Sequence, residues 1–212
     1  MSMALKIDVL QVGVLATNCY VLRTEEQDEN DCVVIDPGSQ SELIISFLDG
    51  ANLTPSLILA THAHGDHLGA AAPLIERYGR QFMIGENDVV PASQQLDWLK
   101  SMLGDFQEPP APSKPLKHGE MITAAGIDIE VLSTPGHTQG SSSFSIDGHV
   151  FTGDTLFKET IGRFDLSDGD QHQEIASIRN ILFALDDDTV VLPGHGESTT
   201  ISHEKEHNRY VR

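Results

Sequence analysis

Hydrophobic residues in the first third of the chain fall into short runs that are rich in Val, Ile and Leu and are separated by polar turns. Runs of this length, partly alternating with polar residues, are typical of β-strands. Two further segments space their apolar residues with a helical period, and a glycine stands at the end of each. We expect strands at residues 5–13, 18–23, 31–38 and 56–61, and helices at residues 41–50 and 68–79.

The rest of the chain continues this alternation, with strand-like runs at residues 126–134, 141–147, 149–154 and 188–196. A helix is expected at residues 171–185, with one apolar face made of Ile175, Ile178, Ile181 and Leu182. Residues 91–103 also have a helical pattern, which the four prolines of residues 104–115 prevent from continuing. Strands and helices interleaved in two similar halves indicate an α/β sandwich of sheets covered by helices.

The charge of the chain limits its partners. Its 212 residues include 13 Lys and Arg against 32 Asp and Glu, a formal net charge of −19. A surface this acidic repels phosphate backbones and anionic lipid heads, so we expect neither nucleic acid nor membrane as a partner. A nuclease would need a basic groove, which the sequence does not offer, and solubility or adaptation to salt is the simpler interpretation of the charge.

The expected compartment is the cytoplasm. No run approaches the ~20 apolar residues of a membrane span, and residues 1–13 lack the cationic start and the cleavage site of a signal peptide. Cys19 and Cys32 lie in neighbouring expected strands and are too few for a disulfide framework. We expect both thiols to be reduced and buried.

A cluster of metal-binding residue types follows the strand expected at residues 56–61. The motif THAHGDH places His62, His64, Asp66 and His67 within six residues, on the loop between that strand and the next helix. A rigid sheet fixes the base of such a loop, which is where functional groups commonly lie. Imidazole and carboxylate ligands suit zinc, iron and manganese. The motif therefore predicts a metal site.

Three more candidate ligands follow other expected strands. His137 stands in TPGHTQG, Asp154 in GDTLF and His195 in PGHG, and each has a glycine beside it. Glycine suits tight turns near a site. Each residue alone could be ordinary loop chemistry, but together with the first motif they form seven groups that converge from four strand ends.

These motifs, with TNCYVL, VVIDPG and IGRFDL, make the chain resemble the metallo-β-lactamase superfamily, and within it the small glyoxalase II-like (hydroxyacylglutathione hydrolase-like) metallohydrolases. The resemblance implies one domain over residues 1–212, a four-layer αββα sandwich with the metals at one edge between the two sheets. It also implies two divalent metal ions per chain, with zinc expected and iron or manganese accepted by the same ligands. His62, His64 and His137 would hold the first ion, Asp66, His67 and His195 the second, and Asp154 would bridge them. Asp66 and Asp154 are the expected catalytic carboxylates.

Such a site favours hydrolysis. A divalent metal lowers the pKa of bound water toward ~7, and a hydroxide shared by two metals could attack a carbonyl carbon without a serine or cysteine nucleophile. A metal can also stabilise the developing oxyanion. Ester, thioester, lactone and amide bonds all suit this chemistry, and we expect a small-molecule thioester as the substrate. The alternatives are a glutathione persulfide dioxygenase with one iron, a lactone or other ester hydrolase, and a metal-binding module without activity.

Differences between this sequence and other groups of the superfamily narrow the range of expected substrates. Class B β-lactamases use a cysteine ligand or lack the bridging aspartate, so we do not expect antibiotic hydrolysis. Full-length glyoxalase II enzymes have a C-terminal helical domain that binds glutathione, whereas this chain ends soon after His195. Their lysine- and tyrosine-bearing segment is replaced here by KETIGRFDL. Arg163 in that segment could bind a substrate carboxylate, or could pair with Asp165 and brace the loop.

The segment HEKEH, from His203 to His207, fits the H-E-x-x-H pattern of zinc proteases. Only five residues follow it, none of them a third ligand, and the segment is rich in charge. We interpret it as a solvated terminal helix that resembles the E-x-x-x-N-P ending of small family members. Glu204 and Asn208 match that ending, whereas Arg209 replaces its proline.

Overall fold

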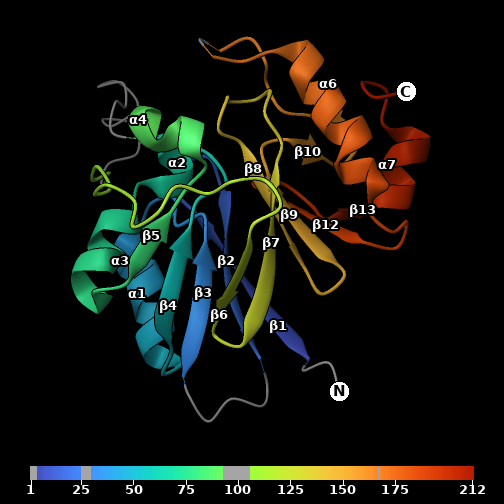
Figure 1. Cartoon of the computed structure of the whole chain (residues 1–212). Coiled ribbons are helices and arrows are strands. Elements are labelled where there is room, and N and C mark those ends of the chain that lie inside the picture. Colours follow the sequence, from blue (N-terminus) through green and yellow to red (C-terminus); the bar gives the residue numbers. More distant parts are fainter. Residues whose placement is uncertain (1–3, 25–29, 93–105, 167) are drawn as a thin grey trace.

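Two β-sheets face each other at the centre of the protein, and helices cover their outer faces (Figure 1). The computed structural model describes residues 4–24, 30–92, 106–166 and 168–212. Each helix within these ranges is too short or too polar to cross a bilayer.

The first sheet has five strands in the order β1-β2-β3-β4-β5. Its strands are β1 (Leu5–Val12), β2 (Thr17–Thr24), β3 (Asp31–Ile35), β4 (Thr54–Leu59) and β5 (Gln81–Met83). The first three strands are antiparallel neighbours, whereas β3, β4 and β5 run parallel. Parallel neighbours need a crossover, and here helices α1 (Ser41–Gly50) and α3 (Ala71–Tyr78) provide it.

The second sheet has six strands in the order β13-β12-β9-β8-β7-β6. Its strands are β6 (Met121–Ala124), β7 (Ile127–Ser133), β8 (Ser142–Ile146), β9 (His149–Gly153), β12 (Val190–Pro193) and β13 (Thr199–Thr200). A small hairpin of β10 (Leu156–Phe157) and β11 (Thr160–Ile161) follows β9. Helix α6 (Gln171–Asn180) precedes β12, and α7 (Ile201–His207) follows β13.

The sheets pack against each other through one apolar core and against the helices through two more. Alternation along β4 sends Leu57 and Leu59 into the core between the sheets, where Phe144 and Phe151 of the second sheet also lie. The rings of Tyr20 and Phe151 meet edge to face across this core, with centroids 5.0 Å apart. Because both faces of β4 are covered toward its C-terminal end, residues 57–60 form a continuous apolar run.

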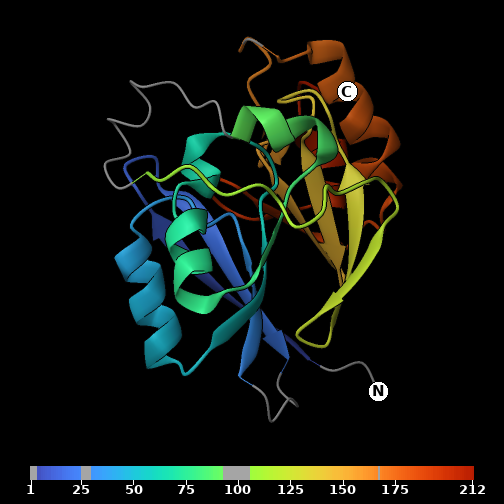
Figure 2. The ribbon, with the colours of Figure 1, turned by 60° about the vertical axis from the view of Figure 1, so that its left-hand side comes forward.

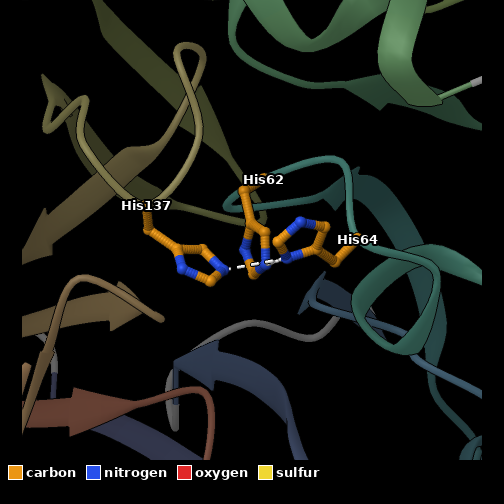
Figure 3. A group of neighbouring side chains, drawn as sticks. All are labelled: His62, His64 and His137. Atoms are coloured by element: carbon orange, nitrogen blue, oxygen red, sulfur yellow. Dashed lines mark hydrogen bonds between the residues drawn. The ribbon is translucent and has the colours of Figure 1, made fainter. Parts of the chain in front are cut away.

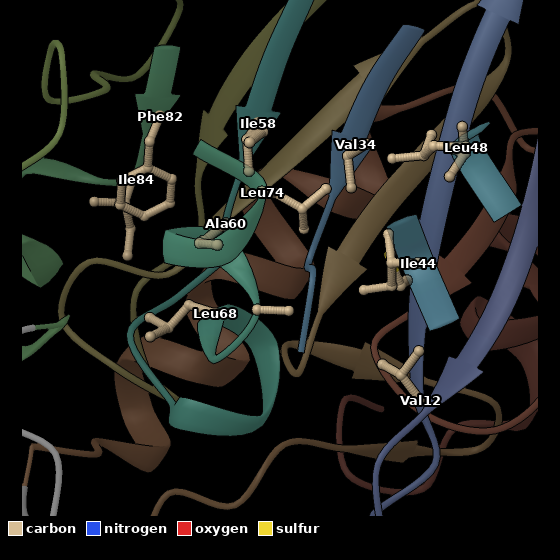
Figure 4. Close-up of a cluster of buried hydrophobic side chains, with 14 of the residues drawn as sticks. Val12, Val34, Ile44, Leu48, Ile58, Ala60, Leu68, Leu74, Phe82 and Ile84 are labelled. Carbon is tan, nitrogen blue, oxygen red and sulfur yellow. The ribbon is translucent and has the colours of Figure 1, made fainter. Parts of the chain in front are cut away.

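The outer cores complete a helix–sheet–sheet–helix sandwich. On one side, Ile44 of α1 and Leu74 of α3 pack against Val34 and Ile58 (Figure 4). On the other side, a matching core joins α6 and α7 to the second sheet through Ile178, Ile201, Val150 and Val191. The turned view separates the two helical layers (Figure 2). The expected four-layer αββα architecture is therefore confirmed.

The motif loop after β4 differs from the expectation. Residues Gly65–Leu68 form a short helix, α2, and the next helix, α3, begins at Ala71 instead of residue 68. Pro73 explains the later start, because its ring excludes the preceding helical turn but is tolerated in the first turn of a new helix. The motif thus lies on a tight helical turn.

The expected helix at residues 171–185 is also divided. Helix α6 ends at Asn180, and the short 3₁₀ helix η2 (Leu182–Ala184) follows it. Most of the helix expected at residues 91–103 lies outside the described residues, and only its first two residues fall in α4 (Val89–Ala92), which follows the 3₁₀ helix η1 (Glu86–Asp88). Both cysteines are buried and free, and burial raises the pKa of Cys32 to about 12.

Candidate metal centre and active site

The loops after β4 and β7 bring three histidines together. His62 Nε2 lies 3.0 Å from His64 Nδ1, and His137 Nε2 lies 2.8 Å from the same His64 atom (Figure 3). His62 and His137 are buried, whereas His64 is partly exposed. Three ring nitrogens thus point at one position, which a single cation can occupy.

A second group lies beside the first. Asp66 and His67 belong to α2, and His195 follows β12. His195 Nε2 lies 3.2 Å from both His67 Nε2 and Asp66 Oδ2. These three ligand atoms also converge within the reach of one cation.

Asp154 lies between the two groups. Its Oδ1 is 3.3 Å from His67 Nε2 of the second group, and its Oδ2 is 3.7 Å from His137 Nε2 of the first. Oδ1 is buried and accepts no hydrogen bond from the described residues. Asp154 can therefore share its carboxylate between two adjacent ions, and all seven candidate residues meet at one place.

Outer contacts orient four of the histidine rings. The Nδ1–H groups of His137 and His195 donate to the carbonyl oxygens of Arg163 and Leu15, at 2.7 and 3.1 Å. His67 Nδ1 lies 3.0 Å from Asp36 Oδ2, and His62 Nδ1 lies 3.0 Å from the hydroxyl of Thr61, which itself donates to Asp36. A carbonyl oxygen only accepts, so in His137 and His195 the proton is on Nδ1 and the Nε2 lone pair faces the centre.

The orientation of the histidine rings fits metal binding. In the first group, His62 and His137 both turn an Nε2 atom toward His64 Nδ1, which can donate a proton to only one of them at a time, whereas a cation at this position can accept a lone pair from all three rings. An outer acceptor on Nδ1 is also the usual support of a histidine metal ligand. The residues therefore fit a dinuclear centre of divalent ions that accept nitrogen and oxygen ligands.

The protein environment lowers the pKa of some of these histidines and raises the pKa of others. Burial and the neighbouring imidazoles lower the pKa of His62, and burial lowers the pKa of His64 to about 4. Burial alone would also lower the pKa of His67, but the carboxylates of Asp154, Asp66 and Asp36 outweigh it and raise that pKa well above its usual value. Metal ions must therefore displace a proton from the second group.

Two loops that carry ligands are joined by Asp88, which the sequence analysis did not select. This buried carboxylate accepts hydrogen bonds from Ala63 N at 2.7 Å, from Thr138 Oγ1 at 2.7 Å and from Gly140 N at 2.8 Å. It therefore ties the His62 loop of the first sheet to the His137 loop of the second. The local sequence END has no signal for this role, because the donors come from distant segments.

Glu174 of α6 is a second buried carboxyl that the sequence analysis missed. It packs directly on Gly136, where an added Cβ would lie 2.3 Å from the Glu174 backbone and where φ is +145°. Burial raises the pKa of Glu174 to about 8. Only a glycine allows this helix to lie so close behind His137, which gives a physical reason for the glycine of TPGH.

The His195 loop is fastened to β2. Asn18 Nδ2 donates to the carbonyl oxygens of Pro193 and Gly196 at 3.0 and 3.1 Å, on either side of His195. The Thr17 hydroxyl lies 3.4 Å from Asp66 Oδ2. The start of β2 thus supports both a carboxylate and a histidine of the second group.

A cavity of about 410 Å³ opens beside the metal centre. Its walls are made by the β10–β11 hairpin and the His195 loop, with the lining residues His137, Asp154, Phe157, Lys158, Thr160, Ile161, Arg163, His195, Gly196 and Glu197. Arg163 Nε donates to Asp165 Oδ1 at 3.0 Å, so the pairing considered in the sequence analysis is present. Lys158 pairs with Glu197 at 2.8 Å.

The histidines of HEKEH lie apart from this centre. His203 Nε2 is 3.0 Å from Glu159 Oε1, and His207 is exposed on α7. Among the described residues, every group able to hold a metal is drawn from the seven candidate ligands.

Fold and site together define a metallohydrolase of the metallo-β-lactamase type. The chain matches the sequence profile of the metallo-beta-lactamase superfamily over residues 12–195 and belongs to this superfamily. It is similar to the hydroxyacylglutathione hydrolase GloC of Haemophilus influenzae, at 33% identity with 98% of each chain covered.

Solved structures agree with this assignment. The B3 metallo-beta-lactamase BLEG-1 superposes with a TM-score of 0.89 at 32% identity, covering 97% of this chain and 99% of that one. TTHA1623, solved in a di-iron-bound form, gives 0.85 at 34% identity, with 96% and 99% covered. ETHE1 from Myxococcus xanthus gives 0.81 at 28% identity, with 96% and 83% covered.

Proposed function

We propose that this protein hydrolyses a small thioester at a centre of two divalent metal ions. The observation that carries the proposal is the pair of three-ligand groups that share Asp154. The similarity to GloC over nearly the whole length of both chains supports the thioester as the bond cleaved. A small-molecule substrate also agrees with the charge of −19, which opposes nucleic acids and anionic membranes.

In this proposal His62, His64 and His137 would hold the first ion, Asp66, His67 and His195 the second, and Asp154 both. Such ions, when bound, would supply a coordinated water of lowered pKa and a Lewis acid for the thioester carbonyl. Asp66 and Asp154 act as the catalytic carboxylates. Neighbouring histidines outweigh burial and lower the pKa of both groups, so their oxygens can accept a hydrogen bond from the attacking water at neutral pH. Zinc is the metal we propose, and the di-iron form of TTHA1623 makes iron the main alternative.

The cavity beside the centre is the proposed substrate site. Phe157 and Ile161 offer apolar surface to the acyl or thiol part, and Arg163 lies at its rim. Its guanidinium forms two hydrogen bonds to Asp165, and a substrate carboxylate could take the place of that partner. We therefore propose Arg163 as a substrate-binding residue.

A persulfide dioxygenase with a single iron is the second candidate function, favoured by the three-histidine group, which could hold one iron without the second group. A dioxygenase needs only the first three-histidine group and open positions on one iron. The complete second group favours the hydrolase. Hydrolysis of a lactone or another ester would use the same residues.

Elemental analysis and a substrate panel separate these functions. We expect about two metal ions per chain and cleavage of S-lactoylglutathione or a simpler thioester under anaerobic conditions. One iron per chain, with oxygen consumed on addition of glutathione persulfide and no thioester cleavage, would establish the dioxygenase instead. A lactone, a simple ester and a chromogenic β-lactam complete the panel, and turnover of one of them alone would overturn the thioester proposal.

A further inference from the structure

Helix α7 and its C-cap carry two buried polar residues, one each, that the proposed reaction does not use. Glu204 and Asn208 are both 0% exposed, although both are polar and stand near the end of the chain. Buried polar groups are costly unless they form hydrogen bonds. Their partners therefore show what this helix holds in place.

The partners belong to the two segments of the chain that carry the walls of the substrate cavity. Glu204 Oε2 accepts a hydrogen bond from the backbone N–H of Glu159 at 2.9 Å, and Asn208 Nδ2 donates to the carbonyl oxygen of Thr160 at 3.0 Å. Glu159 lies in the two-residue turn of the β10–β11 hairpin, and Thr160 follows it directly as the first residue of β11. Glu204 Oε1 accepts from the hydroxyl of Thr199 at 2.7 Å, at the end of the His195 loop.

Every polar side-chain atom of Glu204 and Asn208 has a hydrogen-bond partner. Asn208 Nδ2 also donates to Glu204 Oε2 at 2.8 Å, and Asn208 Oδ1 accepts from the backbone N–H of Tyr210 at 3.1 Å. The hairpin turn needs such support, because Glu159 has a φ of +60°, which is uncommon for a residue with a side chain. The hydrogen bond from its N–H to Glu204 holds the backbone in this conformation.

We infer that Glu204 and Asn208 are positioning residues for the substrate cavity, and that α7 sets the distance between the hairpin wall and the His195 loop. Phe157, Thr160 and Ile161 of the hairpin line this cavity opposite His195. Figure 1 shows α7 beside β13, and the hydrogen bonds of Glu204 and Asn208 place the end of this helix against the β10–β11 hairpin. This role for α7 rests on the proposed function, since the wall matters for a substrate that occupies the cavity.

Three variants test the inference. Glu204→Gln disturbs both walls, and Asn208→Ala removes the bond to Thr160 while leaving that from Glu159 to Glu204 in place. Ile201→Val is the matched control, because Ile201 is buried on the same helix and its side chain packs in the apolar core. We expect metal content to stay that of the wild type in all three, because none of these residues is a candidate ligand.

Hydrogen exchange and kinetics give two independent readouts. We expect exchange of the Glu159 amide, followed by NMR, to become at least about tenfold faster in Glu204→Gln, since local opening governs exchange. We expect KM for S-lactoylglutathione to rise about three- to tenfold in both network variants, because a displaced wall loses contacts with the bound substrate and each loss of about 1.4 kcal/mol weakens binding tenfold. The S-methyl thioester of the same acid has a smaller thiol part to contact the hairpin wall and should show a smaller rise in KM.

Equal changes in the network variants and in Ile201→Val, compared at equal loss of melting temperature, would overturn the inference. Should Glu204→Gln fail to fold, Asn208→Ala decides the question by the same comparison. Wild-type protein that cleaves no thioester would refute the proposed function instead, and the amide exchange of Glu159 would still decide whether α7 holds the hairpin.

Discussion

Replacing Asp88 by alanine should be among the most damaging single changes outside the metal ligands. The variant removes three buried hydrogen bonds to one carboxylate, from Ala63 N, Thr138 Oγ1 and Gly140 N. Each bond to a charged group contributes about 1.5–3 kcal/mol net, and a buried donor that loses its acceptor costs about 1–3 kcal/mol. Single substitutions seldom exceed about 4–5 kcal/mol, because the structure relaxes. We therefore expect a loss of about 3–5 kcal/mol.

Urea unfolding of metal-free protein, followed by circular dichroism, measures this loss as a lower midpoint at an unchanged slope. Asp49→Ala is the matched control, because Asp49 also accepts two hydrogen bonds, from Arg77 and Tyr78, but on the exposed surface. Its substitution should shift the midpoint far less. Since Asp88 joins the His62 and His137 loops, its variant should also lose metal to a competing chelator more readily. Equal midpoints for the two variants would refute the reasoning.

Three further predictions follow from the site. His62→Ala or Asp154→Ala should abolish hydrolysis and release metal, measured by activity and elemental analysis, whereas a change in either from His207→Ala would contradict our assignment of α7. Neighbouring carboxylates raise the pKa of His67, so protons compete with metal for this ligand. Metal occupancy and activity should therefore fall together as pH decreases through that raised pKa. Activity and occupancy that stay constant from neutral to mildly acidic pH would contradict this prediction. Arg163→Ala should raise KM several-fold for a thioester that carries a carboxylate and leave a neutral thioester unchanged, and equal effects on both would show that Arg163 only braces its loop.

The sequence by itself determined the layered fold and the set of candidate ligands. Strand and helix patterns are local, so alternation and helical spacing located most elements, and His62 to His67 are adjacent in the chain. His137, Asp154 and His195 could be found because each follows a strand, and strand ends place loop residues at a sheet edge. Elements of two to four residues, such as β5, β10 and β13, are too short for such patterns.

Only the tertiary structure showed which residues support the metal ligands and the walls of the cavity. Asp88, Glu174 and Glu204 look like ordinary surface acids in the sequence, and all three lie on helices rich in polar residues. Each is fully buried, because distant segments close over it. Asp88 and Glu204 receive their hydrogen bonds from donors as far apart in the chain as Ala63 and Gly140, or Glu159 and Thr199. Contacts between distant segments leave no local pattern in the sequence, whereas the residues of the HAHGDH motif are neighbours in the chain.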